Sequence, residues 1–145
     1  IAGPDGTIPL SIPVVKANKP GQPICETRIS DHGNWRHLHW RALQSAYGNS
    51  PFFEYYEDDF RRFYQPDWEF LTDYNRDLMT LVCELLDITP QINNTEKFQA
   101  VPSMDFQGVA LRPYYQVFSA RHGFIPDLSI VDLLFNMGPE SVLYL

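Results

Sequence analysis

The sequence has few cysteines and little positive charge. Two cysteines among 145 residues cannot form the disulfide framework of a small secreted domain. We therefore expect Cys25 and Cys83 to be free thiols, Cys83 as a small core residue, and the protein to be cytoplasmic. Eleven Lys and Arg against eighteen Asp and Glu give a net charge of −7. This balance disfavours a general nucleic-acid binder and a protein that binds anionic membranes.

Long hydrophobic runs and common catalytic motifs are also missing. The apolar runs are far shorter than the ~20 residues that span a bilayer, so no membrane span is expected. Without a Gly-x-Gly-x-x-Gly, a Walker A loop or a Gly-x-Ser-x-Gly elbow, a glycine-loop nucleotide site and serine-hydrolase chemistry have no support. No known metal-ligand spacing occurs, and His37 and His39 diverge by about 200° on a helix. We predict no metal site, and no cofactor can be named from the sequence.

Aromatic residues, in contrast, are abundant at 14% of the chain. Rings bury a large area at little rotamer cost, and they also form good walls for sugars or bases. Hydrophobic residues make up 44% and charged residues 20%, which are values typical of globular proteins. The length is that of one domain, which we expect to span residues 1–145.

The order of predicted elements indicates a mixed α/β or α+β fold in a single domain. After a turn at residues 3–6, an N-terminal β-hairpin is predicted from two strands, 8–15 and 24–29, although two prolines interrupt the first. Several helices, a small sheet and a buried C-terminal helix should complete the domain. The remaining predicted elements are helices at 31–47, 51–63, 66–87 and 129–138, a strand at 88–94 and an irregular segment at 97–111.

Two of the predicted helices carry capping signals. Ser50 followed by Pro51 is typical of a helix start. Ser129 and Asp132 form a pair that resembles a capping box, and Gly138 occupies the position after the last turn.

An acidic run at residues 57–59 superficially resembles the metal-binding triplet of nucleotide-sugar glycosyltransferases. It lies within a predicted helix, with arginines four positions further on. This spacing favours surface ion pairs, Glu57 with Arg61 and Asp58 with Arg62, over a metal site.

The first long helix places two polar side chains among apolar ones. At 100° per residue, Arg36 and His39 fall on the apolar arc, whereas His37 and Arg41 fall on the polar face. Buried polar groups need partners. Arg36 either pairs with a core carboxylate such as Asp132 or binds a phosphate or carboxylate of a ligand. His39 is either a hydrogen-bonded core imidazole or a proton-transfer group.

The last helix is apolar nearly all round, so we predict that it is buried. Its two polar residues, Asp132 and Asn136, are four positions apart and share a face. A buried polar pair is costly unless it is bonded. Either Asp132 caps the first turn and Asn136 closes a neighbouring loop, or the pair binds sugar or nucleotide hydroxyls with Asp132 as general base.

Further charged residues flank this helix. Arg121 and His122 are expected to contact an anion, and the following Gly123 would let the backbone approach a ligand closely. Glu140 is a second carboxylate at the other end, either a surface charge or a ligand contact. We expect Arg36 and His39 to meet these C-terminal residues around one shared cavity.

Several segments resemble the WbqC-like family of bacterial proteins. They are Ile-Ala-Gly-Pro-Asp-Gly at 1–6, His-Gly-Asn-Trp-Arg-His-Leu-His-Trp at 32–40, Pro-Phe-Phe-Glu-Tyr-Tyr at 51–56, and the run 114–140. The resemblance covers nearly the whole chain. Members of this family usually carry a further N-terminal segment, which we expect this chain to lack.

The family is found in gene clusters for O-antigen and other surface polysaccharides. The resemblance therefore implies a role in their biosynthesis, as a transferase that modifies a nucleotide-activated or amino sugar. A non-catalytic accessory or scaffold protein of the same pathway is the alternative, with the polar residues as core braces and interface contacts. The expected catalytic residues are His39 and Asp132, and the expected ligand-binding residues are Arg36, Arg121, His122, Asn136 and Glu140.

Overall fold

A computed structural model describes residues 1–17, 19, 21–95 and 112–145 of the chain. The strands are β1 (Ala2–Gly3) and β2 (Gly6–Thr7), and the α-helices are α1 (Trp35–Tyr47), α2 (Phe53–Arg61), α3 (Leu71–Leu85), α4 (Ser119–His122) and α5 (Ile130–Met137). The short 3-10 helices are η1 (Ile24–Glu26), η2 (His32–Asn34), η3 (Arg62–Tyr64) and η4 (Gly138–Tyr144). The predicted mixed fold is confirmed as an α+β arrangement whose strands pair antiparallel.

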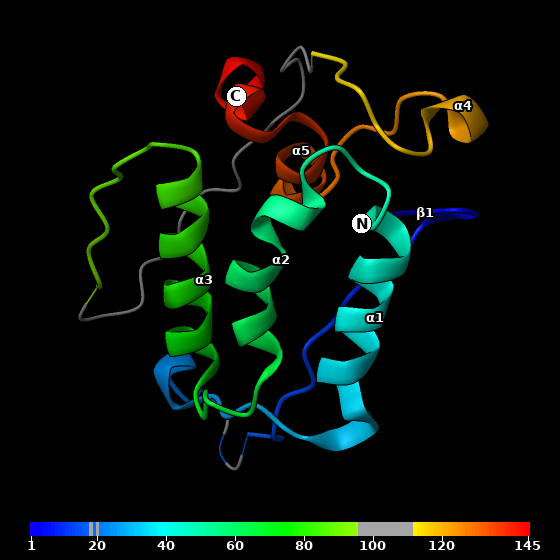
Figure 1. Ribbon diagram of the computed structural model, residues 1–145. Coiled ribbons are helices and arrows are strands. Elements are labelled where there is room, and N and C mark those ends of the chain that lie inside the picture. Colours follow the sequence, from blue (N-terminus) through cyan, green and yellow to red (C-terminus); the bar gives the residue numbers. More distant parts are fainter. Residues whose placement is uncertain (18, 20, 96–111) are drawn as a thin grey trace.

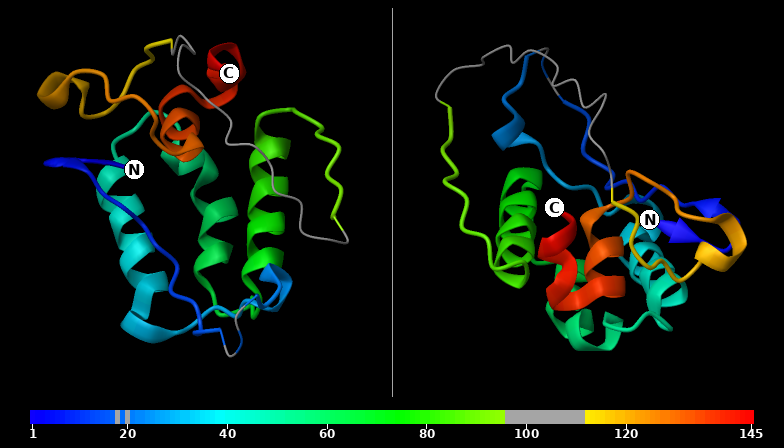
Figure 2. Two further views of the ribbon diagram at one scale, coloured as in Figure 1. Left: turned by 180° about the vertical axis from the view of Figure 1, so that it is seen from behind. Right: turned by 90° about the horizontal axis from the view of Figure 1, so that it is seen from above.

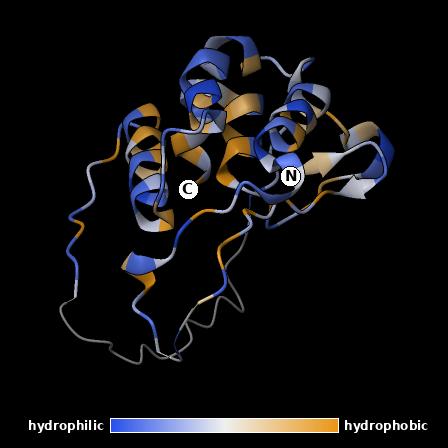
Figure 3. Ribbon diagram, turned by 90° about the horizontal axis from the view of Figure 1, so that it is seen from below, coloured by the Kyte–Doolittle hydropathy of each residue, from blue (hydrophilic) through white to orange (hydrophobic). Residues whose placement is uncertain are grey.

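Helices α1, α2 and α3 lie side by side, and α5 lies near the upper end of the middle helix, α2, in Figure 1. The segment that follows β2 passes in front of α1 in the left panel of Figure 2, from the upper end of the helix toward its lower end. Hydrophobic and hydrophilic residues alternate along the helices (Figure 3). Helices α1, α2, α3 and α5 each bury apolar residues on one face against their neighbours.

Phe135 of α5 lies in the middle of the core and has no exposed surface. Its ring centroid lies 5.2 Å from that of Tyr47, 5.0 Å from that of Phe53 and 5.2 Å from that of Phe60. A buried phenylalanine contributes about 1.5–3 kcal/mol through its removal from water. The prediction that the last helix is buried is correct, because its apolar residues join α1 and α2 here.

The strands that form are not the ones predicted. Residues 8–15 and 24–29 are joined by the isolated antiparallel bridge of Val14 with Ile29 and do not form a continuous ladder. Two prolines in the first segment remove the N–H groups that a ladder needs. The two-stranded sheet forms instead around the predicted turn, where Ala2 pairs with Thr7.

The predicted strand at 88–94 is also wrong, because these residues have no sheet partner in the described part of the chain. Ile88 and Ile92 are exposed, and Asp87 has a φ of 53° directly after the last turn of α3. The irregular segment predicted at 97–111 lies outside the described residues.

Helix α3 begins five positions later than the prediction. The backbone before it is extended, since Phe70 forms an antiparallel bridge with Arg28 and the N–H of Leu71 donates to the carbonyl of Thr27. Pairing with the N-terminal segment therefore replaces the first helical turn that residues 66–70 would have formed.

The two capping predictions also fail in their details. Ser50 Oγ donates to the carbonyl of Tyr47 over 2.7 Å, so it closes α1 and does not cap α2. The bounds of α5 agree with the prediction, and Gly138 follows it with a φ of 56°. However, Ser129 makes no side-chain cap, and the carboxylate of Asp132 points into the core.

Neither predicted ion pair of α2 is present among the described residues. Glu57 Oε1 accepts a hydrogen bond from Gln44 Nε2 over 3.1 Å, which links α2 to α1. The guanidinium of Arg62 lies 5.0 Å from the ring centroid of Phe63.

None of the described helices combines the length and the apolar character that crossing a bilayer requires.

Candidate functional site

Asp132, in the first turn of α5, is a carboxylate with 0% exposure and three side-chain donors. Tyr47 Oη donates to its Oδ1 over 2.7 Å, and Tyr114 Oη donates to its Oδ2 over 2.8 Å. Gln116 Nε2 donates to Oδ2 over 3.2 Å. Three incoming donors suit an ionised carboxylate, which can only accept. These four residues are called the Asp132 network below.

The Asp132 network joins distant parts of the chain. Tyr47 is the last residue of α1, and its hydroxyl also accepts the N–H of Ala2 over 3.1 Å. Gln116 donates to the carbonyl of Ile125 and accepts its N–H, both over 2.9 Å. Both oxygens of the carboxylate and the side-chain amide of Gln116 are thus hydrogen-bonded, as burial demands.

Burial and the neighbouring carboxylate keep the two tyrosines protonated. For Tyr114, burial is the main cause of a raised pKa, and the hydrogen bond to Asp132 adds to it while the bond with Gln116 opposes it. Burial likewise raises the pKa of Tyr47, followed by the charge of Asp132. Both phenols are therefore donors near neutral pH.

Tyr114 also lines a cavity of about 230 Å³ beside α5. Its ring lies 5.3 Å from that of Phe124 and 6.0 Å from that of Tyr144, both edge-on, and all three rings line the cavity. Arg112 and Asp127 contribute the charged groups of the wall. We call this the Tyr114 cavity. Its lining is completed by Leu128, Ser129, Ile130, Leu133 and Leu145.

A larger cavity, of about 660 Å³, is lined by residues of the segment 19–28 and by Phe70. The guanidinium of Arg28 lies 4.7 Å from the Phe70 ring centroid and pairs with Glu69. None of the predicted site residues lines this cavity. Volume alone does not make the larger cavity a reactive site. The Tyr114 cavity is the better candidate, because its lining residue Tyr114 is hydrogen-bonded to the buried carboxylate of Asp132.

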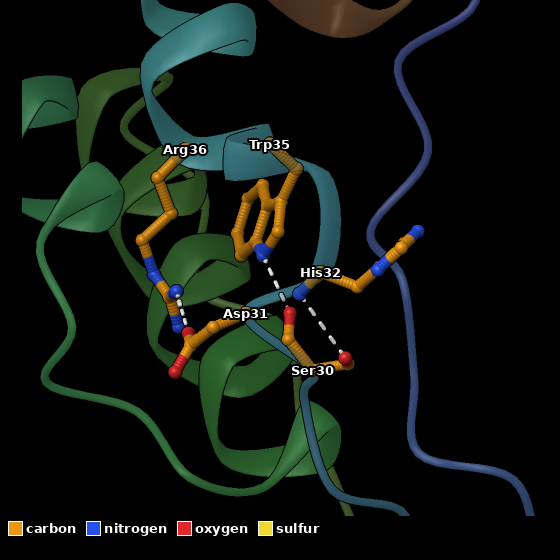
Figure 4. A network of polar contacts seen from close by, with 5 residues as sticks. All are labelled: Ser30, Asp31, His32, Trp35 and Arg36. Carbon is orange, nitrogen blue, oxygen red and sulfur yellow. Dashed lines mark hydrogen bonds and ion pairs between the residues drawn. The ribbon is translucent and has the colours of Figure 1, made fainter.

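Arg36 lies at the start of α1, where it forms an ion pair with Asp31 (Figure 4). Its guanidinium lies 4.7 Å from the ring centroid of Trp35, and its side chain is 15% exposed. Trp35 Nε1 donates to the carbonyl of Ser30 over 2.9 Å. Arg36 therefore has a carboxylate partner, but this partner is the exposed Asp31 and not a core carboxylate such as Asp132.

His39 is buried one turn further along α1. Its ring lies edge-on to those of Trp35 and Tyr64, at centroid distances of 5.1 and 6.4 Å. Burial lowers the pKa of His39, while a hydrogen bond with the backbone of Ser11 opposes the shift. This environment is that of a core imidazole. His37 is exposed, as predicted.

Arg36 and His39 are not close to Asp132. His39 precedes Tyr47 by eight residues on α1, which corresponds to about 12 Å along the helix axis. Tyr47 is the residue of α1 that touches the carboxylate. The described residues therefore do not assemble the expected site into one cavity, and the ligand-binding role of Arg36 stays a prediction.

Arg121 and His122, in α4, both contact the turn between the two strands. Arg121 Nη1 donates to the carbonyl of Pro4 over 2.9 Å, and His122 Nε2 lies 2.9 Å from the same oxygen. This pair fixes α4 to the N-terminal turn. Neither residue lines the Tyr114 cavity.

Asn136 is buried one turn after Asp132, and its Nδ2 donates to the carbonyl of Asp132 over 2.7 Å. Its Oδ1 is buried without a hydrogen-bond partner among the described residues. Glu140 is exposed in η4. Asp132 and Asn136 are thus both buried polar residues of α5, but their side chains bond to different groups. The Asp132 carboxylate bonds to side chains of other segments, whereas Asn136 bonds to the backbone of its own helix.

The sequence alone did not identify Tyr47, Tyr114 and Gln116 as partners of Asp132. Tyr114 belongs to the C-terminal run singled out above, yet nothing in its spacing to Asp132 indicates contact. Tyr47 falls on the apolar arc of α1, where a ring is expected and a bonding hydroxyl is not.

No group of three or more His, Cys, Asp or Glu in the described part of the chain could hold a metal ion.

Comparison with known proteins identifies a family and one curated relative. The model of the WbqC-like protein family matches residues 1–105. An uncharacterized protein of Mycobacterium tuberculosis is 28% identical over 173 aligned positions, which cover 94% of this chain and 74% of that protein. No solved structure matches the chain. Since the family model covers well over half of its residues, the chain belongs to the WbqC-like protein family.

Proposed function

We propose that the protein is a cytoplasmic transferase of O-antigen or other surface-polysaccharide biosynthesis, which modifies a nucleotide-activated or amino sugar. Family membership supports the pathway, and the free thiols of Cys25 and Cys83 suit a reducing compartment. One observation carries the proposal for a chemical role. Tyr114 links the buried carboxylate of Asp132 to a cavity with aromatic walls.

The cavity has the properties of a sugar site. Aromatic rings offer flat apolar faces to the C–H faces of a sugar, and a few polar groups fix its orientation. Tyr114, Phe124 and Tyr144 provide such rings. The hydroxyl of Ser129 provides a hydrogen-bonding group in the same wall.

Tyr114 and Asp132 can act together as a general base. An acceptor hydroxyl bonded to Tyr114 Oη attacks the activated carbon of the donor, and the leaving nucleotide departs with the electron pair of the broken bond. The acceptor proton passes to Tyr114 Oη, while the phenolic proton passes to Asp132 Oδ2. Because burial raises the pKa of Tyr114, the phenol stays protonated before the step, as this relay requires.

The test measures transfer and binding with the full chain. A panel of nucleotide sugars is screened by thermal shift, and nucleotide release is then followed with monosaccharide acceptors. A ligand at 100 times its dissociation constant stabilises a protein by about 2.7 kcal/mol. We expect at least one nucleotide sugar to bind and to transfer its group. Tyr114→Phe should slow transfer by about 10²–10⁴-fold while the protein remains folded.

A non-catalytic accessory protein is the second candidate. Val142 and Leu143 in η4 and the adjacent Leu145 are exposed apolar side chains, as a docking surface would present. The predicted ligand residues are also dispersed, as this alternative requires. Absence of sugar binding and of transfer across the panel would favour this candidate over the transferase.

A further inference from the structure

We infer that the Tyr114 cavity takes a single sugar that carries both an anionic group and an amine, such as a phosphorylated amino sugar. This inference rests on the proposed function and specifies its substrate class. It is carried by the size of the cavity and by two oppositely charged residues in its wall, Arg112 and Asp127.

The volume limits the ligand to about one ring. Pockets for drug-sized ligands start at about 300 Å³. The Tyr114 cavity, at about 230 Å³, is smaller and cannot enclose a whole nucleotide sugar. The rings of Phe124 and Tyr144 stand edge-on to that of Tyr114 in the cavity wall, and a small ligand with an apolar face can pack against such rings.

Arg112 supplies the positive charge. Its Nη1 donates to the carbonyl of Leu143 over 3.2 Å, which holds the guanidinium against η4. Its other N–H donors have no partner among the described residues. A guanidinium fixed at one nitrogen and open at the others suits the two-pronged binding of phosphate or carboxylate.

Asp127 supplies the negative charge. It has a φ of 56°, a conformation that non-glycine residues adopt infrequently, in the loop before α5. Within the described part of the chain it has no ion-pair partner, and it does not pair with Arg112 although both line the same cavity. A carboxylate left without a cation beside aromatic rings suits the ammonium group of an amino sugar.

Together these groups are complementary to a zwitterion. A ligand with one charge would pair with only one of these residues, whereas a phosphorylated amino sugar can pair with both. Tyr114 then contacts a hydroxyl of the same ring, which connects the bound sugar to Asp132.

Isothermal titration calorimetry with four probes tests the inference. The probes are glucose, glucosamine, glucose 6-phosphate and glucosamine 6-phosphate, each titrated into the full chain. Exposed ion pairs change affinity by about fivefold or less, so each charge should tighten binding by up to about fivefold, and glucosamine 6-phosphate should bind tightest. Arg112→Gln should remove only the preference for phosphate, and Asp127→Asn only the preference for the amine.

Two surface variants provide the controls. Arg41→Gln and Asp59→Asn remove the same charges at exposed positions outside the cavity, and both preferences should survive. Equal binding of all four sugars would overturn the inference and leave the proposed transferase intact. Inorganic phosphate that binds as tightly as glucosamine 6-phosphate would also overturn it, since the rings would then contribute nothing. Group transfer from nucleotide sugars, measured separately, tests the proposed function.

Discussion

Tyr114 Oη donates to Asp132 Oδ2 over 2.8 Å, so a ring in the wall of a cavity is bonded to a carboxylate that has no exposed surface. Tyr47 bonds the other oxygen of the same carboxylate, yet Tyr47 does not line the cavity. The two tyrosines therefore allow the structural and the chemical roles of Asp132 to be separated.

We expect both Tyr114→Phe and Tyr47→Phe to lower the free energy of unfolding, Tyr47→Phe by the larger amount. Each removes one hydrogen bond to a buried charge, which costs about 1.5–3 kcal/mol, and Tyr47→Phe also removes the acceptor of the Ala2 N–H. Only Tyr114→Phe should also slow transfer, by about 10²–10⁴-fold, because Tyr114 lines the cavity and Tyr47 does not. Urea denaturation gives the stabilities, and nucleotide release gives the rates.

The comparison is informative because both variants keep the ring. If Tyr47→Phe slowed transfer as much as Tyr114→Phe, the tyrosines would act only by holding Asp132 in place. The proton relay would then be wrong.

Gly138→Ala should destabilise the protein more than Gly123→Ala. Both glycines have positive φ, 56° and 72°, and an alanine in such a conformation costs about 1–3 kcal/mol. At Gly138 a Cβ would also overlap the ring of Phe52, with 2.6 Å to Cγ, whereas at Gly123 it would meet open space. Chemical denaturation of both variants measures the difference, and equal losses would exclude the contact with Phe52.

Lowering the pH below about 6.5 should weaken the fold through His39. Burial lowers the pKa of His39 from its ordinary value of 6.5, so the unfolded chain binds the proton more readily than the folded chain. This contribution is complete above pH 6.5 and is lost as the pH falls through the lower folded value. His39→Gln should remove that part of the pH dependence.

Unfolding free energies at pH 7.5 and 5.5 check this expectation. His37→Gln is the matched control, because His37 is exposed on the same helix. An identical acid response in wild type and His39→Gln would show that the imidazole is not held neutral by burial.

Phe135→Ala should be among the most damaging single changes. The ring has no exposed surface and contacts three other rings, and such truncations cost about 3–5 kcal/mol. Tyr55→Ala, at a side chain that is 78% exposed on α2, should change stability by less than about 0.5 kcal/mol. Thermal or urea unfolding of the pair measures both.

The parts of the fold that follow from local rules could be predicted. The end of α1 at Tyr47 and the bounds of α5 agree with apolar periodicity and with Gly138 after the last turn. Strands could not be placed equally well, because their hydrogen bonds depend on segments far apart. Thus Phe70 pairs with Arg28, which delays α3.

The candidate site was predictable only in part. The polar face of α5 and the burial of His39 follow from helical spacing. The partners of these residues do not, since Tyr47 and Asp132 are 85 positions apart and meet only when α1 and α5 pack. The partner of Arg36 could not be predicted either, although it is close in the sequence. Gly33, with a φ of 75°, bends the chain and brings Asp31 within reach of Arg36.

Amide chemical-shift mapping of the full chain with glucosamine 6-phosphate tests the central assignment most directly. If the Tyr114 cavity is the functional site, the largest shifts will lie at Arg112, Tyr114, Asp127 and Ser129, and Tyr114→Phe will reduce them. Shifts centred on Arg36 and His39, or on Arg28 and Phe70, would contradict it.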